Sequence, residues 1–107
     1  MSRLPDDALV VRGGRNTPDA LDGRIKMHPS GVVGVSVEAA AGATVEQLAA
    51  AVPHGQVGVT TVGRVRAAGG DVIPTSGQSP THATLTGLDP EQISRLLTPT
   101  RRNPNRR

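Results

Sequence analysis

Short apolar runs alternate with short amphipathic segments along the chain. β-branched and alternating residues cluster in five places, which predicts strands over residues 8–12, 32–37, 56–60, 71–74 and 82–86. Between these runs, apolar residues recur at helical spacing, which predicts helices over residues 18–27, 45–52, 62–68 and 90–97. Short strands and helices in this mixture indicate a compact α+β domain.

Capping residues mark where three of these helices begin. Thr17 precedes Pro18, and Asp89 precedes another proline, which is typical of a first helical turn. Thr44 and Gln47 have the spacing of a capping box. The expected ends lie at helix-breaking residues, namely Pro53, Gly69 and Pro99.

The composition limits which residues can form the core and bears on the cellular compartment of the protein. A chain of 107 residues predicts one domain, and without Phe, Trp or Tyr its core must consist of Val, Leu, Ile and Ala. There is no Cys, so disulfides and thiolate sites are excluded. No apolar segment approaches the roughly 20 residues that span a bilayer, and the first residues lack a signal-peptide pattern. We therefore expect a cytoplasmic protein.

The positive charge is concentrated at the C-terminal end. The formal net charge is +3, but four of the 12 basic residues lie in the last seven positions, which leaves 8 basic against 9 acidic residues elsewhere. A Pro, Asn and Arg segment without apolar residues predicts a disordered basic tail over residues 99–107. With a flexible N-terminus over residues 1–5, the domain is expected to span residues 6–98. Without aromatic residues to stack on bases, nucleic acid is expected to make only weak contacts with the tail.

Arg12 stands out among the polar residues. It ends the apolar run of residues 8–11 and is followed by Gly13 and Gly14. A buried strand would thus deliver a guanidinium to a place where the backbone carries no side chains, which suits an anion such as a dinucleotide phosphate. The alternative is an edge-strand Arg before an ordinary Gly-Gly turn.

Two further polar residues occupy comparable strand positions. Ser36 lies in Gly-Val-Ser-Val over residues 34–37, and His82 opens His-Ala-Thr over residues 82–84. An early strand ending in Arg, a central Gly-x-Ser-Val strand and a late His-x-Thr strand resemble the small bacterial toxins with an ADP-ribosyltransferase-like fold, including type VI secretion effectors. The resemblance implies a split β-sheet core with short flanking helices. It also implies a toxin that acts through NAD or a related nucleotide.

The resemblance also implies roles for the three residues. Arg12 would pair with a phosphate or orient the nicotinamide end of NAD, with Gly13 beside it. Ser36 would structure the pocket by hydrogen bonding, and His82 would bind the ribose or transfer a proton, so these three are the expected catalytic residues. A toxin of this kind implies a neutralising antitoxin or immunity protein as partner. Transferases of this fold commonly carry a late Glu and an aromatic ring at the nicotinamide, whereas here no Glu stands beside His82 and no aromatic is present.

Two other functions are compatible with the sequence. One is a non-catalytic interaction module, such as an antitoxin, immunity or accessory protein, in which the three residues would be scattered. The other is a 2H-type phosphoesterase, because His28-Pro29-Ser30 and His82-Ala83-Thr84 resemble its paired His-x-Ser/Thr motifs, although Pro29 disfavours the first strand. His54 is expected in a loop, and three His without matched spacing predict no metal site.

Overall fold

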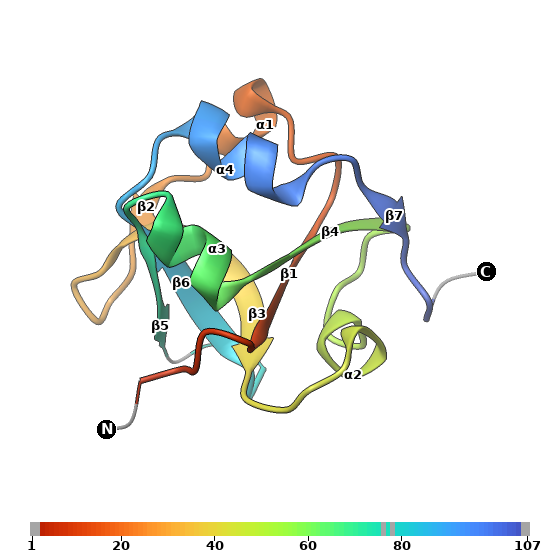
Figure 1. Ribbon diagram of the computed structural model, residues 1–107. Coiled ribbons are helices and arrows are strands. Elements are labelled where there is room, and N and C mark those ends of the chain that lie inside the picture. Colours follow the sequence, from red (N-terminus) through yellow and green to blue (C-terminus); the bar gives the residue numbers. More distant parts are fainter. Residues whose placement is uncertain (1–2, 76, 78, 106–107) are drawn as a thin grey trace.

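One curled antiparallel sheet forms a half-barrel around which four short helices pack (Figure 1). The computed structural model describes residues 3–75, 77 and 79–105. The strands are β1 (Leu9–Gly13), β2 (Lys26–Met27), β3 (Val33–Ala40), β4 (Gln56–Thr61), β5 (Asp71–Pro74), β6 (His82–Thr86) and β7 (Arg101–Arg102). The helices are α1 (Pro18–Asp22), α2 (Val45–Ala49), α3 (Val62–Ala67) and α4 (Pro90–Leu97). The expected α+β class is confirmed.

The core has two parts, one on each face of β1. Side chains alternate along a strand, so Val10 joins the larger cluster with Leu21 of α1 and Ile93 of α4, while Val11 joins the smaller cluster with Leu48 of α2. Burying each such aliphatic side chain contributes about 1.5–3 kcal/mol, so the two clusters together can hold the fold without an aromatic residue.

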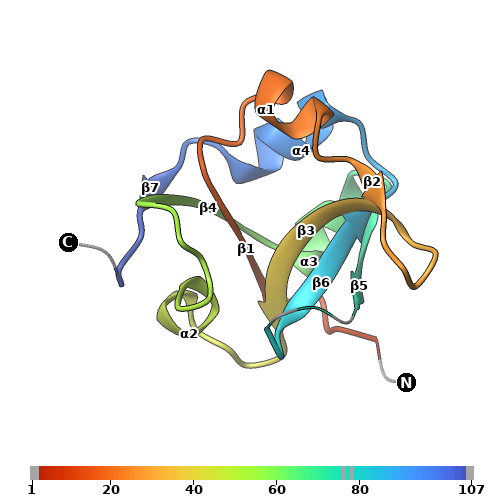
Figure 2. The ribbon, with the colours of Figure 1, turned by 180° about the vertical axis from the view of Figure 1, so that it is seen from behind.

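The sheet is interrupted along one edge of β3. The strands follow the order β5-β6-β3-β1-β4-β7, but β1 pairs with β3 only through residues 9–11 and 38–40. Further along the same edge, β2 pairs with Val33 and Gly34. Figure 2 shows β1 and β3 meeting at one end and diverging toward α1. On this side, residues 35–37 therefore have no strand partner in the part of the chain that the structure describes.

The helix expected over residues 18–27 is shorter than predicted, and the last two residues of that range form a strand instead. Thr17 caps α1 as predicted, because the Ala20 amide donates to its hydroxyl at 3.3 Å, but the helix ends at Asp22. Gly23 follows as the C-cap, where a glycine favours termination. Residues 26–27 then pair with β3 as β2, which the sequence pattern did not predict. Among the other bounds, the largest differences are that α2 ends at Ala49 and that β3 continues to Ala40.

Both ends of the expected domain extend further than predicted. The prediction of a disordered tail is wrong for residues 99–105, because β7 pairs with β4 and Asn103 is fully buried. The Nδ2 atom of Asn103 donates to the carbonyl oxygens of Val52 and His54 at 3.3 and 2.9 Å, which ties the tail to the segment after α2. At the other end, Leu4 packs against the larger core cluster, so the flexible segment does not include it. Residues 1–2 and 106–107 lie outside the described residues.

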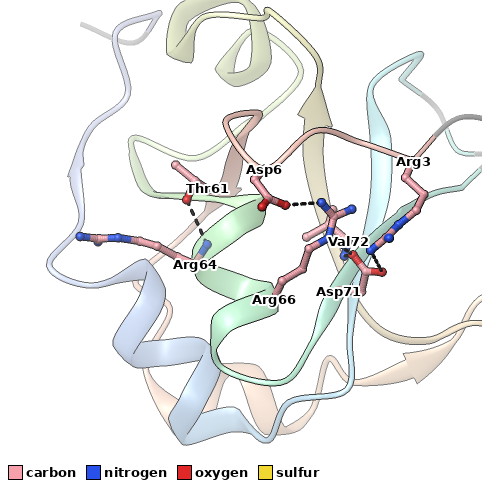
Figure 3. A network of polar contacts seen from close by, with 7 residues as sticks. All are labelled: Arg3, Asp6, Thr61, Arg64, Arg66, Asp71 and Val72. Carbon is pink, nitrogen blue, oxygen red and sulfur yellow. Dashed lines mark hydrogen bonds and ion pairs between the residues drawn. The ribbon is translucent and has the colours of Figure 1, made fainter.

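Partly exposed ion pairs hold α3 against the N-terminal segment and β5. Arg66 donates through Nη1 to Asp6 and through Nε to Asp71, the latter at 2.9 Å (Figure 3). Burial acts to raise the pKa of Asp71, but the Val72 amide, Arg66 and Arg3 outweigh it and hold that pKa below its ordinary value. The hydrogen bond to Asp6 and the pairing with Asp71 raise the pKa of Arg66. The N-terminal segment is thereby joined to α3 and β5, with Asp6 and Arg66 separated by 60 positions.

Candidate functional site

A cleft of about 610 Å³ opens where the edge of β3 is uncovered. Its walls come from the end of β1 and the following loop, from α1, from β2 and β3, and from residues 51–54 after α2. This volume falls within the range of about 300–1,000 Å³ that is usual for small-molecule sites. The interrupted sheet thus produces a site large enough for a small molecule.

The cleft is strongly cationic. Its lining includes Arg12, Arg15, Arg24 and Lys26, and its one acidic lining residue among those described is Glu38. Within the described part of the chain, none of the four cations forms an ion pair. Burial, and then repulsion from Arg24, lower the pKa of Arg12. Burial and repulsion both disfavour the charged form of Arg12, and a bound anion would offset these two effects. The electrostatics therefore favour a negatively charged ligand.

Arg12 bridges the gap in the sheet. It is the first residue of β1 beyond the pairing with β3, and its Nη1 donates to the carbonyl oxygen of Ser36 at 2.6 Å. Its Nε is buried and has no hydrogen-bond partner among the described residues. The Asn16 side chain donates to the Arg12 carbonyl at 3.1 Å, which fixes the end of the strand. Arg12 is the penultimate residue of β1, one position before the end of the strand, where the sequence predicted the last one.

Gly13 has a packing role that the sequence did not indicate. A Cβ at this position would lie 2.4 Å from Cδ2 of His54 and 2.4 Å from Cγ1 of Val52. The absent side chain thus makes room for these two residues. Gly13 still lines the cleft, and the close packing sets the position of His54, which lines it as well.

Ser36 and His82 lie side by side, as expected of residues in one site. In the β3–β6 ladder, Ser36 is opposite Thr84 and Glu38 is opposite His82. His82 reaches diagonally so that its Nε2 is 3.2 Å from the Ser36 hydroxyl. Its Nδ1 is 2.8 Å from the hydroxyl of Thr75, which in turn is 3.0 Å from that of Thr84. Both imidazole nitrogens are therefore engaged.

Glu38 supplies a carboxylate that the linear sequence did not place beside His82. It follows Ser36 by two residues, so strand alternation puts both side chains on one face. One carboxylate oxygen accepts a hydrogen bond from the Thr81 hydroxyl at 2.6 Å. The cross-strand register, which was not known from the sequence, is the signal that brings Glu38 opposite His82.

Two histidines line the cleft, and the third, His82, contacts one of them. His28 and His54 line it, and the rings of His28 and His82 lie 5.4 Å apart between centroids, tilted by 30°. Nδ1 of His28 also accepts from the Ser30 amide at 3.0 Å and lies 2.8 Å from its hydroxyl. The sequence interpretation considered His28 only for the phosphoesterase alternative and expected His54 in a loop, because the two residues come from loops beside β2 and after α2.

Comparison with known proteins gives no family assignment. No protein-family model, curated protein or solved structure matches the chain significantly. No described helix is long and apolar enough to cross a membrane. No cluster of three or more His, Asp or Glu suited to a metal ion occurs within residues 3–75, 77 and 79–105.

Proposed function

We propose that this protein is a small toxin that acts through NAD or a related nucleotide on an ADP-ribosyltransferase-like split sheet. The observation that carries the proposal is that Ser36 contacts both other residues, which come from two further strands: Arg12 donates to its carbonyl oxygen, and Nε2 of His82 lies 3.2 Å from its hydroxyl. A non-catalytic module gives no reason for these three residues to meet at one place beside the cleft.

The unpaired cations support a ligand with a diphosphate group. The guanidinium groups of Arg12 and Arg24 suit phosphate oxygens because a planar fork of donors can contact two of them. Lys26 adds a third positive charge in the same cleft. A concave site of this charge fits a compact dianion attached to ribose better than an extended acidic peptide.

Glu38 is proposed to face the reacting ribose. Loss of nicotinamide from NAD leaves positive charge on the ribose, and a carboxylate in the same cleft stabilises that charge. Glu38 is the acidic residue of the described lining, and the Thr81 hydroxyl holds its side chain in place. It would thereby supply the carboxylate that the resemblance places later in the chain.

The phosphoesterase function is less well supported. In that mechanism two histidines act on a phosphate from different sides. A centroid separation of 5.4 Å is a ring-to-ring contact distance, so His28 and His82 touch each other and leave no space for a phosphate between them.

Isothermal titration calorimetry with NAD and with inorganic pyrophosphate tests the proposal. We expect both to bind, and Arg12→Ala and Arg24→Ala to weaken each by about tenfold or more, since a charge-assisted hydrogen bond is worth about 1.5–3 kcal/mol. Arg64→Ala and Arg95→Ala remove cations outside the cleft lining and serve as matched controls. If neither compound binds the folded protein, the interaction-module function takes precedence, and a protein partner would then be sought as its ligand.

A further inference from the structure

We propose that Ser36 is a nucleophile of the cleft, with His82 as the base that takes its proton and Thr75 as the residue that positions His82. This inference rests on the proposed function where it concerns NAD, but the reactivity of Ser36 can be tested separately. The hydrogen-bonded chain runs from the Ser36 hydroxyl to Nε2 of His82, and from Nδ1 of His82 to the Thr75 hydroxyl.

The geometry is that of an activated hydroxyl. A nucleophile within about 2.6–3.2 Å of an imidazole nitrogen, with the other nitrogen held by a third group, is the arrangement that activates serine in enzymes. Ser36 meets the first condition at 3.2 Å, and Thr75 meets the second at 2.8 Å. When Nδ1 of His82 donates to Thr75, Nε2 is left as the acceptor for the Ser36 proton.

The surroundings of Ser36 favour reaction with an electrophile that carries negative charge. Its side chain is exposed and lines the cleft. Arg12 lies against its carbonyl oxygen, and Lys26 lines the same cavity. These cations would hold a phosphate or phosphonate while the hydroxyl attacks.

With NAD, the step transfers an ADP-ribosyl group to the protein itself. The Ser36 oxygen forms a bond to the anomeric carbon of the ribose, and the bond from that carbon to the nicotinamide nitrogen breaks. The electron pair of the broken bond leaves with nicotinamide, which departs as a neutral molecule. His82 takes the hydroxyl proton at Nε2, so that atoms and charge balance.

Ser30 provides a matched control within the same region. Its hydroxyl also lies 2.8 Å from a histidine nitrogen, Nδ1 of His28. That nitrogen already accepts from the Ser30 backbone amide at 3.0 Å, so its lone pair is occupied. The Ser30 hydroxyl therefore contacts an imidazole nitrogen that is not free to accept its proton.

The decisive experiment treats the purified full-length chain with a fluorophosphonate probe and locates the adduct by tandem mass spectrometry. Attack forms a bond from oxygen to phosphorus and expels fluoride. We expect labelling at Ser36, its loss in Ser36→Ala, and no change in Ser30→Ala. His82→Gln should slow labelling by about 100-fold or more, the lower range of general-base catalysis. Thr75→Val should also slow it, whereas Thr75→Ser, which keeps the hydroxyl, should restore the rate.

The outcomes separate this inference from the proposed function. Absence of Ser36 labelling in the folded protein, or labelling that is undiminished in His82→Gln, would overturn the nucleophile whether or not NAD binds. A parallel incubation with NAD should yield one ADP-ribosyl group on Ser36 and free nicotinamide. Labelling by the fluorophosphonate without any binding of NAD or pyrophosphate would leave Ser36 as a nucleophile and overturn the nucleotide function. Bound NAD without an adduct would overturn the transfer step.

Discussion

The guanidinium of Arg12 donates a hydrogen bond to the carbonyl oxygen of Ser36 at 2.6 Å, across the stretch of β3 that neither β1 nor β2 covers. A side chain thus takes the place of a missing strand partner. Because the backbone of β3 remains otherwise open on this side, the same gap that weakens the sheet gives a ligand access to Ser36. The predictions below follow from this arrangement and from the contacts that surround it.

The identity of the cation at position 12 should matter as much as its charge. In bacteria that lack a neutralising antitoxin or immunity protein, expression of the unmodified protein should slow growth, and Arg12→Ala should relieve this effect. Arg12→Lys should not preserve toxicity, because one ammonium cannot both reach the Ser36 carbonyl and present a planar fork to a phosphate. Growth curves at matched expression levels measure the effect, and full toxicity of Arg12→Lys would contradict the bidentate role.

Asn103 should be important for stability although it lies in the predicted tail. Asn103→Ala leaves the Val52 and His54 carbonyls without their donor in a buried site. Lost hydrogen bonds and an unfilled space should lower the free energy of unfolding by about 2–3 kcal/mol. Urea denaturation followed by circular dichroism measures this. Asn105→Ala, which removes an exposed contact to the Glu46 carbonyl, should cost much less.

Gly13 should not tolerate a methyl group. Gly13→Ala would push against Val52 and His54, and forced packing of this kind costs about 1–3 kcal/mol. Gly23→Ala is the matched control, because its Cβ would meet nothing within 4 Å and its φ of −76° suits any residue. Thermal melts should show a lower midpoint for the first variant and an unchanged or slightly higher midpoint for the second. Equal midpoints would contradict the packing argument.

The dependence of stability on pH should report Asp71. Its pKa is lower in the folded state than its ordinary value of 3.8, so the stabilisation that it provides is present above that value and is lost as the pH falls through the folded pKa. Asp71→Asn removes this group, and its unfolding free energy should therefore decline less steeply than that of the unmodified protein as the pH falls below about 4.

A surface carboxylate provides the comparison for that titration. Glu91→Gln alters only an exposed pair with Arg95 and should leave the acid slope nearly unchanged. Urea titrations at several pH values measure all three proteins. If Asp71→Asn keeps the slope of the unmodified protein, the network around Arg66 does not contribute to acid stability.

The sequence predicted those parts of the fold that depend on local pattern. Strand alternation identified the segments that carry Arg12, Ser36 and His82, and capping residues located the starts of α1, α2 and α4. Whether Arg12, Ser36 and His82 come together depends on which strands pair. The pattern within one strand carries no information on which strand lies beside it.

The missed features all depend on contacts between distant segments. β2 has only two residues, which is too short for any periodicity, and it exists because the edge of β3 is free to receive it. Burial of Asn103 depends on carbonyls about 50 positions earlier in the chain. The position of Glu38 opposite His82 required the β3–β6 register.

The burial of Asn103 also determines when the cleft can be completed during synthesis of the chain. The ribosome produces Arg12, Ser36, His54 and His82 before it reaches Asn103, whose side chain secures the carbonyls of the segment that walls the cleft. Until that residue has left the exit tunnel, the wall formed by residues 51–54 lacks its anchor. We therefore expect nascent chains that stop before Asn103 to have an incomplete site, so that a cell would encounter a ligand-competent cleft only after translation has passed this point.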